Sequence, residues 1–246
     1  QAEGTITFAA ATTTQNISIT TVNDGVSEAD ESFKITISNP NLAEVTLGTS
    51  VHTAIIKNDD VPGSIVYYVS SQNGNDGNAG TSAGTGNAFA TIGAAAAVAG
   101  ASDIVYVGPG TYSENVSPAN SGTAADPIYY YADPSAVNNT GDTPGDVIIS
   151  ATGNVVDISG LSYVVLDGFT ITGGTNGILA QNAASNVTFR NLNVHTNTTG
   201  IRLGNGPSST VTAVEIENSV IHDNTGTAIH IDRSSDATSI QNNLVY

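Results

Sequence analysis

The fold is decided by the stretch from Ser162 to Tyr246, in which one short pattern of residues occurs four times. An apolar residue begins each copy, and another apolar residue ends it five places later. The copies start 23, 27 and 24 residues apart, and such unequal spacing is typical of solenoid coils with constant strands and variable corner loops. The four copies are Leu166-Asp167-Gly168-Phe169-Thr170-Ile171, Phe189-Arg190-Asn191-Leu192-Asn193-Val194, Ile216-Glu217-Asn218-Ser219-Val220-Ile221 and Ile240-Gln241-Asn242-Asn243-Leu244-Val245.

Each copy is predicted to contribute parallel strands. The apolar residues of Val187-Thr188-Phe189 and Val214-Glu215-Ile216 lie two apart, which is the period of a strand buried on one face. A second short strand follows the turn, at 177–179, 200–203 and 228–231. Coils stacked at about 4.8 Å pair each strand with its counterpart in the next coil, without crossover helices. The sequence therefore predicts an all-β fold, a parallel β-helix solenoid.

The copies resemble the repeats of right-handed parallel β-helix proteins of the pectate-lyase-like superfamily. Asn191, Asn218 and Asn242 stand where that family keeps an Asn ladder. The resemblance implies that each amide bonds the equivalent residue of the next coil and satisfies buried turn groups. Gly168 takes this position in the first copy, so the ladder is expected to begin at the second. The right-handed sense of the helix is likewise implied by the resemblance.

Composition limits the partners of this chain of 246 residues. Its net charge is −17 with five Lys and Arg, which disfavours nucleic acid because binding there depends on basic side chains releasing counterions. No apolar run approaches the roughly 20 residues of a spanning helix, so no membrane insertion is expected. Without Cys, the chain has no disulfide or thiolate metal site. Abundant Thr and Asn with little Lys suit a secreted or cell-surface protein.

Residues 1–60 are expected to form a partial antiparallel β-sandwich, with strands at 4–8, 16–20, 32–37 and 53–56. The segments 23–33, 38–40, 47–48 and 56–60 resemble the C-terminal half of a Calx-β domain. Either the missing strands lie upstream, or another chain donates them, which would make the protein a filament subunit. Because the chain begins with Gln1 and ends inside the fourth copy, we expect a piece of a longer polypeptide or its ordered part.

The Calx-β resemblance implies a Ca²⁺ site at one end of the sandwich. The residues that match the family's metal ligands are Asp24, Glu28, Asp59 and Asp60. Ca²⁺ takes six to eight oxygens, so four carboxylates need bidentate binding, backbone carbonyls or water to complete the shell. The alternative is that these carboxylates belong to solvated acidic loops that only keep the domain soluble.

The β-helix is expected at 65–246, after a linker at 61–64. Residues 65–100 form its N-terminal strand and cap, and 101–246 form the coils. Thr91 is the expected N-cap of a short Ala-rich helix that ends at Gly100. This helix covers the first coil, whose apolar interior would otherwise face water. The segments 74–92 and 102–112 resemble the opening of secreted β-helix proteins.

Enzymes of the pectate-lyase-like superfamily cut acidic polysaccharides, with Ca²⁺ and a basic residue in lyases or paired Asp residues in hydrolases. Either site places charged residues on outward positions of adjacent coils. The alignment stacks Asp167, Arg190 and Glu217 in one such column. Because carboxylates flank Arg190 on both sides, we interpret this column as an ion-pair ladder and not as a catalytic base with its substrate. A surface pair of this kind contributes at most about 1 kcal/mol.

Other columns leave alternatives open. His195 and His222 stack as a surface ladder, or as a pair that binds metal or shares a proton. Tyr129 and Tyr131 alternate with Tyr130, so one set faces outward, either as a sugar platform or packed under the loop 133–145.

Near the chain end, Arg202, His230 and Asp232 are the weak candidates for catalysis. The first hypothesis is an extracellular structural or adhesive scaffold that self-assembles or joins neighbouring domains, and that binds Ca²⁺ and glycan. The alternative is the N-terminal part of a secreted polysaccharide lyase or glycoside hydrolase acting on acidic glycans.

Overall fold

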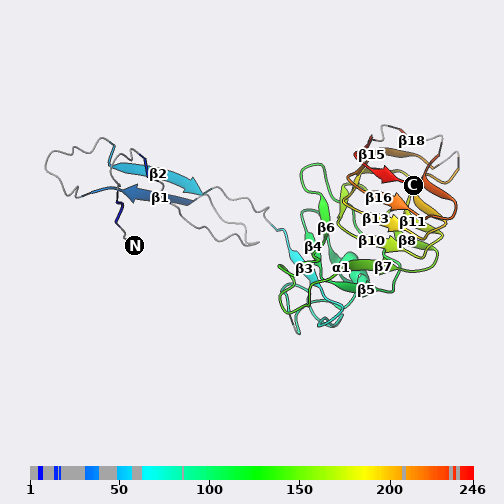
Figure 1. Ribbon diagram of the computed structural model, residues 1–246, viewed down its shortest axis with the longest axis horizontal. Coiled ribbons are helices and arrows are strands. Elements are labelled where there is room, and N and C mark those ends of the chain that lie inside the picture. The colour runs from blue at the N-terminus through cyan, green and yellow to red at the C-terminus, as the bar shows by residue number, and fades with distance from the viewer. Residues whose placement is uncertain are drawn as a thin grey trace.

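A computed structural model describes residues 5–7, 14–15, 17, 31–38, 49–56, 63–84, 86–206, 209–232, 235–236 and 239–246. From residue 63 on, the described residues wind into a parallel β-solenoid of three sheets with one short helix, α1 (Ile92–Val98) (Figure 1). The predicted all-β solenoid with a short N-terminal helix is therefore confirmed.

The first sheet contains β3 (Val66–Val69), β4 (Ile104–Val107), β6 (Ile128–Ala132), β9 (Val164–Asp167), β12 (Ala184–Arg190) and β15 (Val211–Glu217), with β18 (Ser235–Asp236) and β19 (Ser239–Gln241) both paired to β15. The second sheet contains β5 (Gly110–Tyr112), β7 (Val147–Ser150), β10 (Thr170–Thr172), β13 (Asn193–His195), β16 (Val220–His222) and β20 (Leu244–Val245). The third sheet contains β8 (Asn154–Asp157), β11 (Asn176–Ala180), β14 (Thr199–Leu203) and β17 (Thr227–Ile231).

The strand register confirms the alignment of the four copies. Phe189 lies opposite Leu166 in one neighbouring coil and Ile216 in the other, and Ile216 lies opposite Ile240. The same frame continues in the second sheet, where Ile171 is paired with Val194. Inward positions of successive coils therefore stack apolar on apolar, and this continuous core supplies the main driving force for the fold.

The core is fully buried along the middle coils. The side chains that are almost completely inaccessible come from all three sheets, from the corners between them and from α1; the largest are Tyr130, Phe169, Phe189, Ile92, Ile128, Ile149, Ile158, Ile171, Ile178, Leu192, Ile201 and Leu203. The last coil differs, since Ile240, Leu244 and Val245 are 42%, 57% and 47% exposed. Burial therefore decreases toward the end of the described solenoid.

The corner after the first sheet explains why Asn recurs in the repeats. Asn191, Asn218 and Asn242 have φ of 54°, 50° and 54°, and Gly168 in the first copy has φ of 86°. Left-handed backbone conformations favour Gly and, among residues with a side chain, Asn. The repeated Asn is thus selected in the first place by the conformation of the corner.

The Asn ladder itself lies at a different corner from the one predicted. Asn191 is exposed and donates its Nδ2 to Asp167 Oδ1 at 2.7 Å. The amide-to-amide bond is made instead by Asn197, which is 1% exposed and whose Nδ2 lies 3.1 Å from Asn224 Oδ1. The corner after the second sheet turns these side chains inward, where buried backbone groups need partners.

Helix α1 covers the first coil, as predicted, with Thr91 as its N-cap. The Thr91 hydroxyl accepts from Ala94 N at 3.2 Å. The Glu114 carboxylate accepts from Ile92 N and Gly93 N, both at 2.8 Å. Ile92, Ala95 and Ala96 bury their side chains in the core, so the lid is both packed and capped.

In the N-terminal segment, β1 (Glu31–Thr36) pairs antiparallel with β2 (Val51–Ile56), and Phe33 lies opposite Ala54. This confirms the antiparallel pairing expected of a partial sandwich. Phe33, Ile35 and Ala54 share one face of this two-stranded sheet and are half-buried, whereas Ile55 lies on the other face and is 60% exposed. Of the predicted strand at 4–8, residues 5–7 are described and do not form a strand, and the predicted strand at 16–20 lies outside the described residues except for residue 17.

Candidate functional site

The four residues expected to bind Ca²⁺ lie outside the described part of the chain: Asp24, Glu28, Asp59 and Asp60. The Ca²⁺ site therefore stays a prediction. Within the described residues, no group of three or more His, Asp or Glu is arranged to hold a metal ion. In the same residues no helix is long and apolar enough to cross a membrane.

The predicted column of Asp167, Arg190 and Glu217 is present on the outer face of the first sheet, and its ion pair joins Arg190 to Asp167. Arg190 lies opposite Asp167 in one coil and Glu217 in the next. Its Nε is 2.7 Å from Asp167 Oδ2, and this hydrogen bond raises the pKa of Arg190 above its usual value. Tyr68, Tyr106 and Tyr131 continue the column toward the N-terminal coils, one residue per strand.

The weak catalytic candidates meet at the outer face and edge of the third sheet. Arg202 of β14 is paired with His230 of β17, and Asp232 follows β17. Asp232 Oδ2 lies 3.8 Å from Arg202 Nη2, and Asp232 Oδ1 lies 3.9 Å from His230 Nε2. The side chains of Arg202, His230 and Asp232 are 29%, 41% and 23% exposed, so solvent reaches all three.

The loop after β14 holds this cluster in place. Arg202 Nε donates to Gly204 O at 3.1 Å, and Nη2 donates to Asn205 Oδ1 at 3.1 Å. Asp232 Oδ2 accepts from Gly206 N at 2.7 Å. The arrangement therefore presents a guanidinium that can bind an anionic group beside an imidazole that can exchange a proton.

The His column is a stacked ladder on the second sheet. The rings of His195 and His222 are 5.1 Å apart, and the ring of Tyr246 lies 5.2 Å from His222. His222 Nδ1 contacts Asp223 Oδ2 at 2.7 Å, and Nε2 contacts Asn193 Oδ1 at 3.0 Å. Both nitrogens of His222 are occupied, which fits a surface ladder better than a metal ligand.

The tyrosine pair faces outward from the first sheet. Tyr130 is buried, whereas Tyr129 and Tyr131 lie partly exposed on the outer face with ring centroids 5.5 Å apart and an interplanar angle of 8°. The loop 133–145 hydrogen bonds to the corner at 70–73, for example through Asp142 and Ser70.

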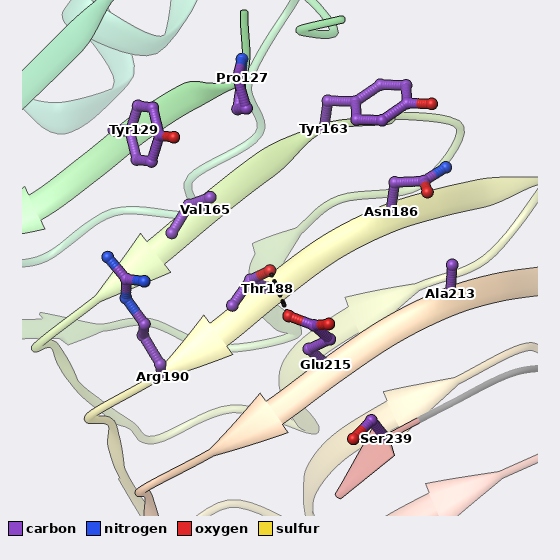
Figure 2. A pocket seen from close by; sticks show the side chains of 10 residues that line it. All are labelled: Pro127, Tyr129, Tyr163, Val165, Asn186, Thr188, Arg190, Ala213, Glu215 and Ser239. Carbon is purple, nitrogen blue, oxygen red and sulfur yellow. Dashed lines mark hydrogen bonds between the residues drawn. The ribbon is translucent and has the colours of Figure 1, made fainter. Parts of the chain in front are cut away.

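Beside this pair lies an open groove of about 380 Å³ across five successive coils (Figure 2). We call it the tyrosine groove; its lining residues are Pro127, Tyr129, Tyr163, Val165, Asn186, Thr188, Arg190, Ala213, Glu215 and Ser239. Figure 2 shows Tyr129 and Tyr163 at its upper side and Thr188 beside Glu215 lower down, where Thr188 Oγ1 lies 3.4 Å from Glu215 Oε2.

Sequence reasoning found Tyr129 and Arg190 but missed the rest of the groove. Tyr163, Asn186 and Ala213 form a column of left-handed residues, with φ of 56°, 53° and 51°. Positive φ in Tyr and Ala has no sequence signal, because neither residue favours it. Asn186 was the one available hint, since Asn tolerates this conformation.

Two segments of the chain match known families. Residues 135–246 match the right handed beta helix region, and residues 1–60 match the Calx-beta domain. No curated protein matches the chain.

Solved structures share the solenoid. A rhamnogalacturonan lyase is 19% identical with a TM-score of 0.55, over 74% of this chain and 51% of that chain. The GH136 lacto-N-biosidase from Eubacterium ramulus is 16% identical with a TM-score of 0.51, over 63% of this chain and 34% of that chain. The chain thus spans from about a third to about half of these proteins, and at such low identity the likeness concerns the fold.

Proposed function

We propose that this chain is part of a secreted polysaccharide-processing protein with its reaction site at Arg202, His230 and Asp232. The observation that carries the proposal is the convergence of these three side chains on the outer face and edge of the third sheet. Arg202 is one of only five Lys and Arg in a chain with a net charge of −17, and its guanidinium can bind the carboxylate of an acidic sugar. The similar solved structures include a lyase and a glycoside hydrolase, which also supports the proposal.

The reaction that suits these groups is β-elimination from a uronate unit. Arg202 binds the carboxylate and stabilises the negative charge that develops on it. Neutral His230 takes the proton from the carbon next to the carboxylate. The electron pair left behind forms a carbon–carbon double bond, the bond to the glycosidic oxygen breaks, and that oxygen takes a proton from water. Asp232 orients the two basic side chains through its contacts with both.

The test is to incubate the chain with polygalacturonate and alginate and to follow the ultraviolet absorbance of the unsaturated uronate product. Arg202→Ala and His230→Ala are expected to lower turnover by about 10²-fold or more, which is the usual loss for a group that acts in the transition state. His195→Ala on the second sheet is the matched control and should keep full activity. Full activity in His230→Ala, or no product from either polymer, would contradict the proposal.

A structural or adhesive role is the second candidate function. It is supported by the pairing of Arg190 with Asp167 and by the regular ladders of the second sheet, which stiffen a rod without any need for chemistry. This role predicts concentration-dependent assembly without turnover. Sedimentation velocity at increasing protein concentration measures the assembly directly.

A further inference from the structure

We propose that the tyrosine groove on the first sheet binds a neutral glycan chain. The groove lies on a different sheet from Arg202, so the inference goes beyond the proposed function and does not depend on it. Its occupant is inferred from three features of the lining: oriented aromatic rings, a column of left-handed backbone, and charges that are balanced within the protein.

The aromatic rings are held in place before any ligand binds. Tyr129 and Tyr131 are nearly parallel, and Tyr131 stacks on Tyr106 with centroids 5.8 Å apart and an interplanar angle of 25°. A pyranose ring has an apolar C–H face that packs on such a surface and a rim of hydroxyls that hydrogen bonds to its surroundings. Because stacking on Tyr131 already orders the Tyr129 ring, the entropy cost of packing a sugar against it is small.

The left-handed column shapes the far side of the groove. Tyr163, Asn186 and Ala213 occupy equivalent positions on successive coils, next to the paired residues Ser162, Ser185 and Thr212. For a residue such as Tyr or Ala this conformation costs about 1–2 kcal/mol. Left-handed residues also recur at other corners, such as Asn191 and Asn218, so the role of this column is to bend the strands and shape the groove. Here the bend sets Tyr163 across the groove from Arg190 (Figure 2).

The polar groups in the groove favour hydroxyls over anions. The Arg190 charge is already compensated by Asp167, and Glu215 adds a carboxylate. Thr188, Asn186 and Ser239 supply neutral donors and acceptors. An anionic polymer meets the Glu215 carboxylate here while Arg190 is held by Asp167, so local repulsion disfavours it. Neutral sugars have no such penalty, and the groove crosses five coils, which suits an extended chain.

The test is affinity electrophoresis of the full chain in gels that contain soluble β-glucan, xylan, galactan or galactomannan, with polygalacturonate as the acidic probe. At least one neutral polymer should retard the protein, with dissociation constants from its concentration dependence. Tyr129→Ala and Tyr163→Ala are each expected to weaken binding about tenfold, as for the loss of one aromatic contact. Tyr129→Phe keeps the ring and should retain affinity. Glu215→Gln should retain neutral binding.

The controls separate this site from the proposed reaction site. Tyr246→Ala removes a 70% exposed tyrosine on the second sheet and should leave retardation unchanged. Arg202→Ala should also leave it unchanged while abolishing turnover. The proposal is overturned if no neutral polymer retards the protein, if the tyrosine variants bind as well as the wild type while circular dichroism shows them folded, or if polygalacturonate alone binds.

Discussion

Asn197 donates its side-chain amide to Asn224 Oδ1 in the next coil at 3.1 Å, and its own Oδ1 accepts from Gly174 N in the preceding coil at 2.9 Å. One buried side chain thus links three consecutive coils. Ile171 O and His195 O also accept from the same amide, at 3.2 and 2.9 Å. These contacts satisfy backbone groups that the corner leaves without strand partners.

Replacing Asn197 with Ala should therefore destabilise the solenoid strongly. The change leaves Gly174 N–H and two carbonyls without this partner, and we expect a loss of about 3 kcal/mol in the free energy of unfolding. Urea denaturation followed by circular dichroism measures it. Asn218→Gly is the control: Asn218 is exposed at φ 50°, a conformation that Gly adopts readily, so stability should change by less than about 0.5 kcal/mol. Equal losses in the two variants would contradict the assignment of the ladder.

Glu114 should be the main stabiliser of the capping helix. Glu114→Ala removes the acceptor of Ile92 N and Gly93 N at the helix N-terminus, and a loss of about 1–2 kcal/mol is expected. Asp146→Ala, which removes an exposed carboxylate elsewhere, should have almost no effect. Amide hydrogen exchange of residues 92–98 provides the local readout, and protection that is unchanged in Glu114→Ala would disprove the capping role.

Two buried tyrosines should respond in opposite ways to loss of their hydroxyl. Tyr112 Oη donates to Gly108 O at 2.8 Å and accepts from Ser71 N at 3.1 Å, so Tyr112→Phe should cost about 1–3 kcal/mol. Tyr130 Oη has no hydrogen-bond partner within the described residues, so Tyr130→Phe should leave stability unchanged or raise it by up to about 1 kcal/mol. Thermal denaturation at neutral pH compares the pair, and a larger loss in Tyr130→Phe would contradict the prediction.

The same tyrosines predict loss of stability in alkali. Burial raises the pKa of Tyr112 and of Tyr130 above the usual value of 10.0, because it penalises the charged phenolate. A tyrosine whose pKa is higher in the folded state than in the unfolded state contributes to stability. This contribution is complete below pH 10.0, the pKa of the unfolded state, and is lost as the pH rises toward the pKa of the folded state. Unfolding midpoints should therefore fall above about pH 10, and less steeply in Tyr130→Phe. Identical slopes for wild type and Tyr130→Phe would count against this linkage.

Ca²⁺ is predicted to stabilise the N-terminal segment through Asp24, Glu28, Asp59 and Asp60. Removing the metal with a chelator should lower the melting temperature of that segment within the full chain, since a ligand bound only to the native state adds to its stability. Asp59→Asn combined with Asp60→Asn should abolish the difference. Identical melting curves with and without chelator would show that these carboxylates only solvate the loops.

The sequence by itself determined the coil, its register and its lid. Leu166, Phe189, Ile216 and Ile240 could be aligned because burial requires an apolar residue at the same place in every coil, and periodicity preserves that requirement in the primary structure. The Arg190 column followed from the same alignment. Helix α1 was predictable because Thr91 and the Ala-rich run are local signals.

Only the tertiary structure decided which Asn is buried and where the grooves lie. Asn191 and Asn197 are chemically identical, and the direction of the chain at each corner places one outside and the other inside. The left-handed column at Tyr163, Asn186 and Ala213 depends on contacts between coils that local preference opposes. The meeting of Arg202 with Asp232 likewise needed the path of the chain beyond β17. Stacking is encoded by repetition, whereas corner direction and side-chain contacts across coils depend on the assembled three-dimensional packing.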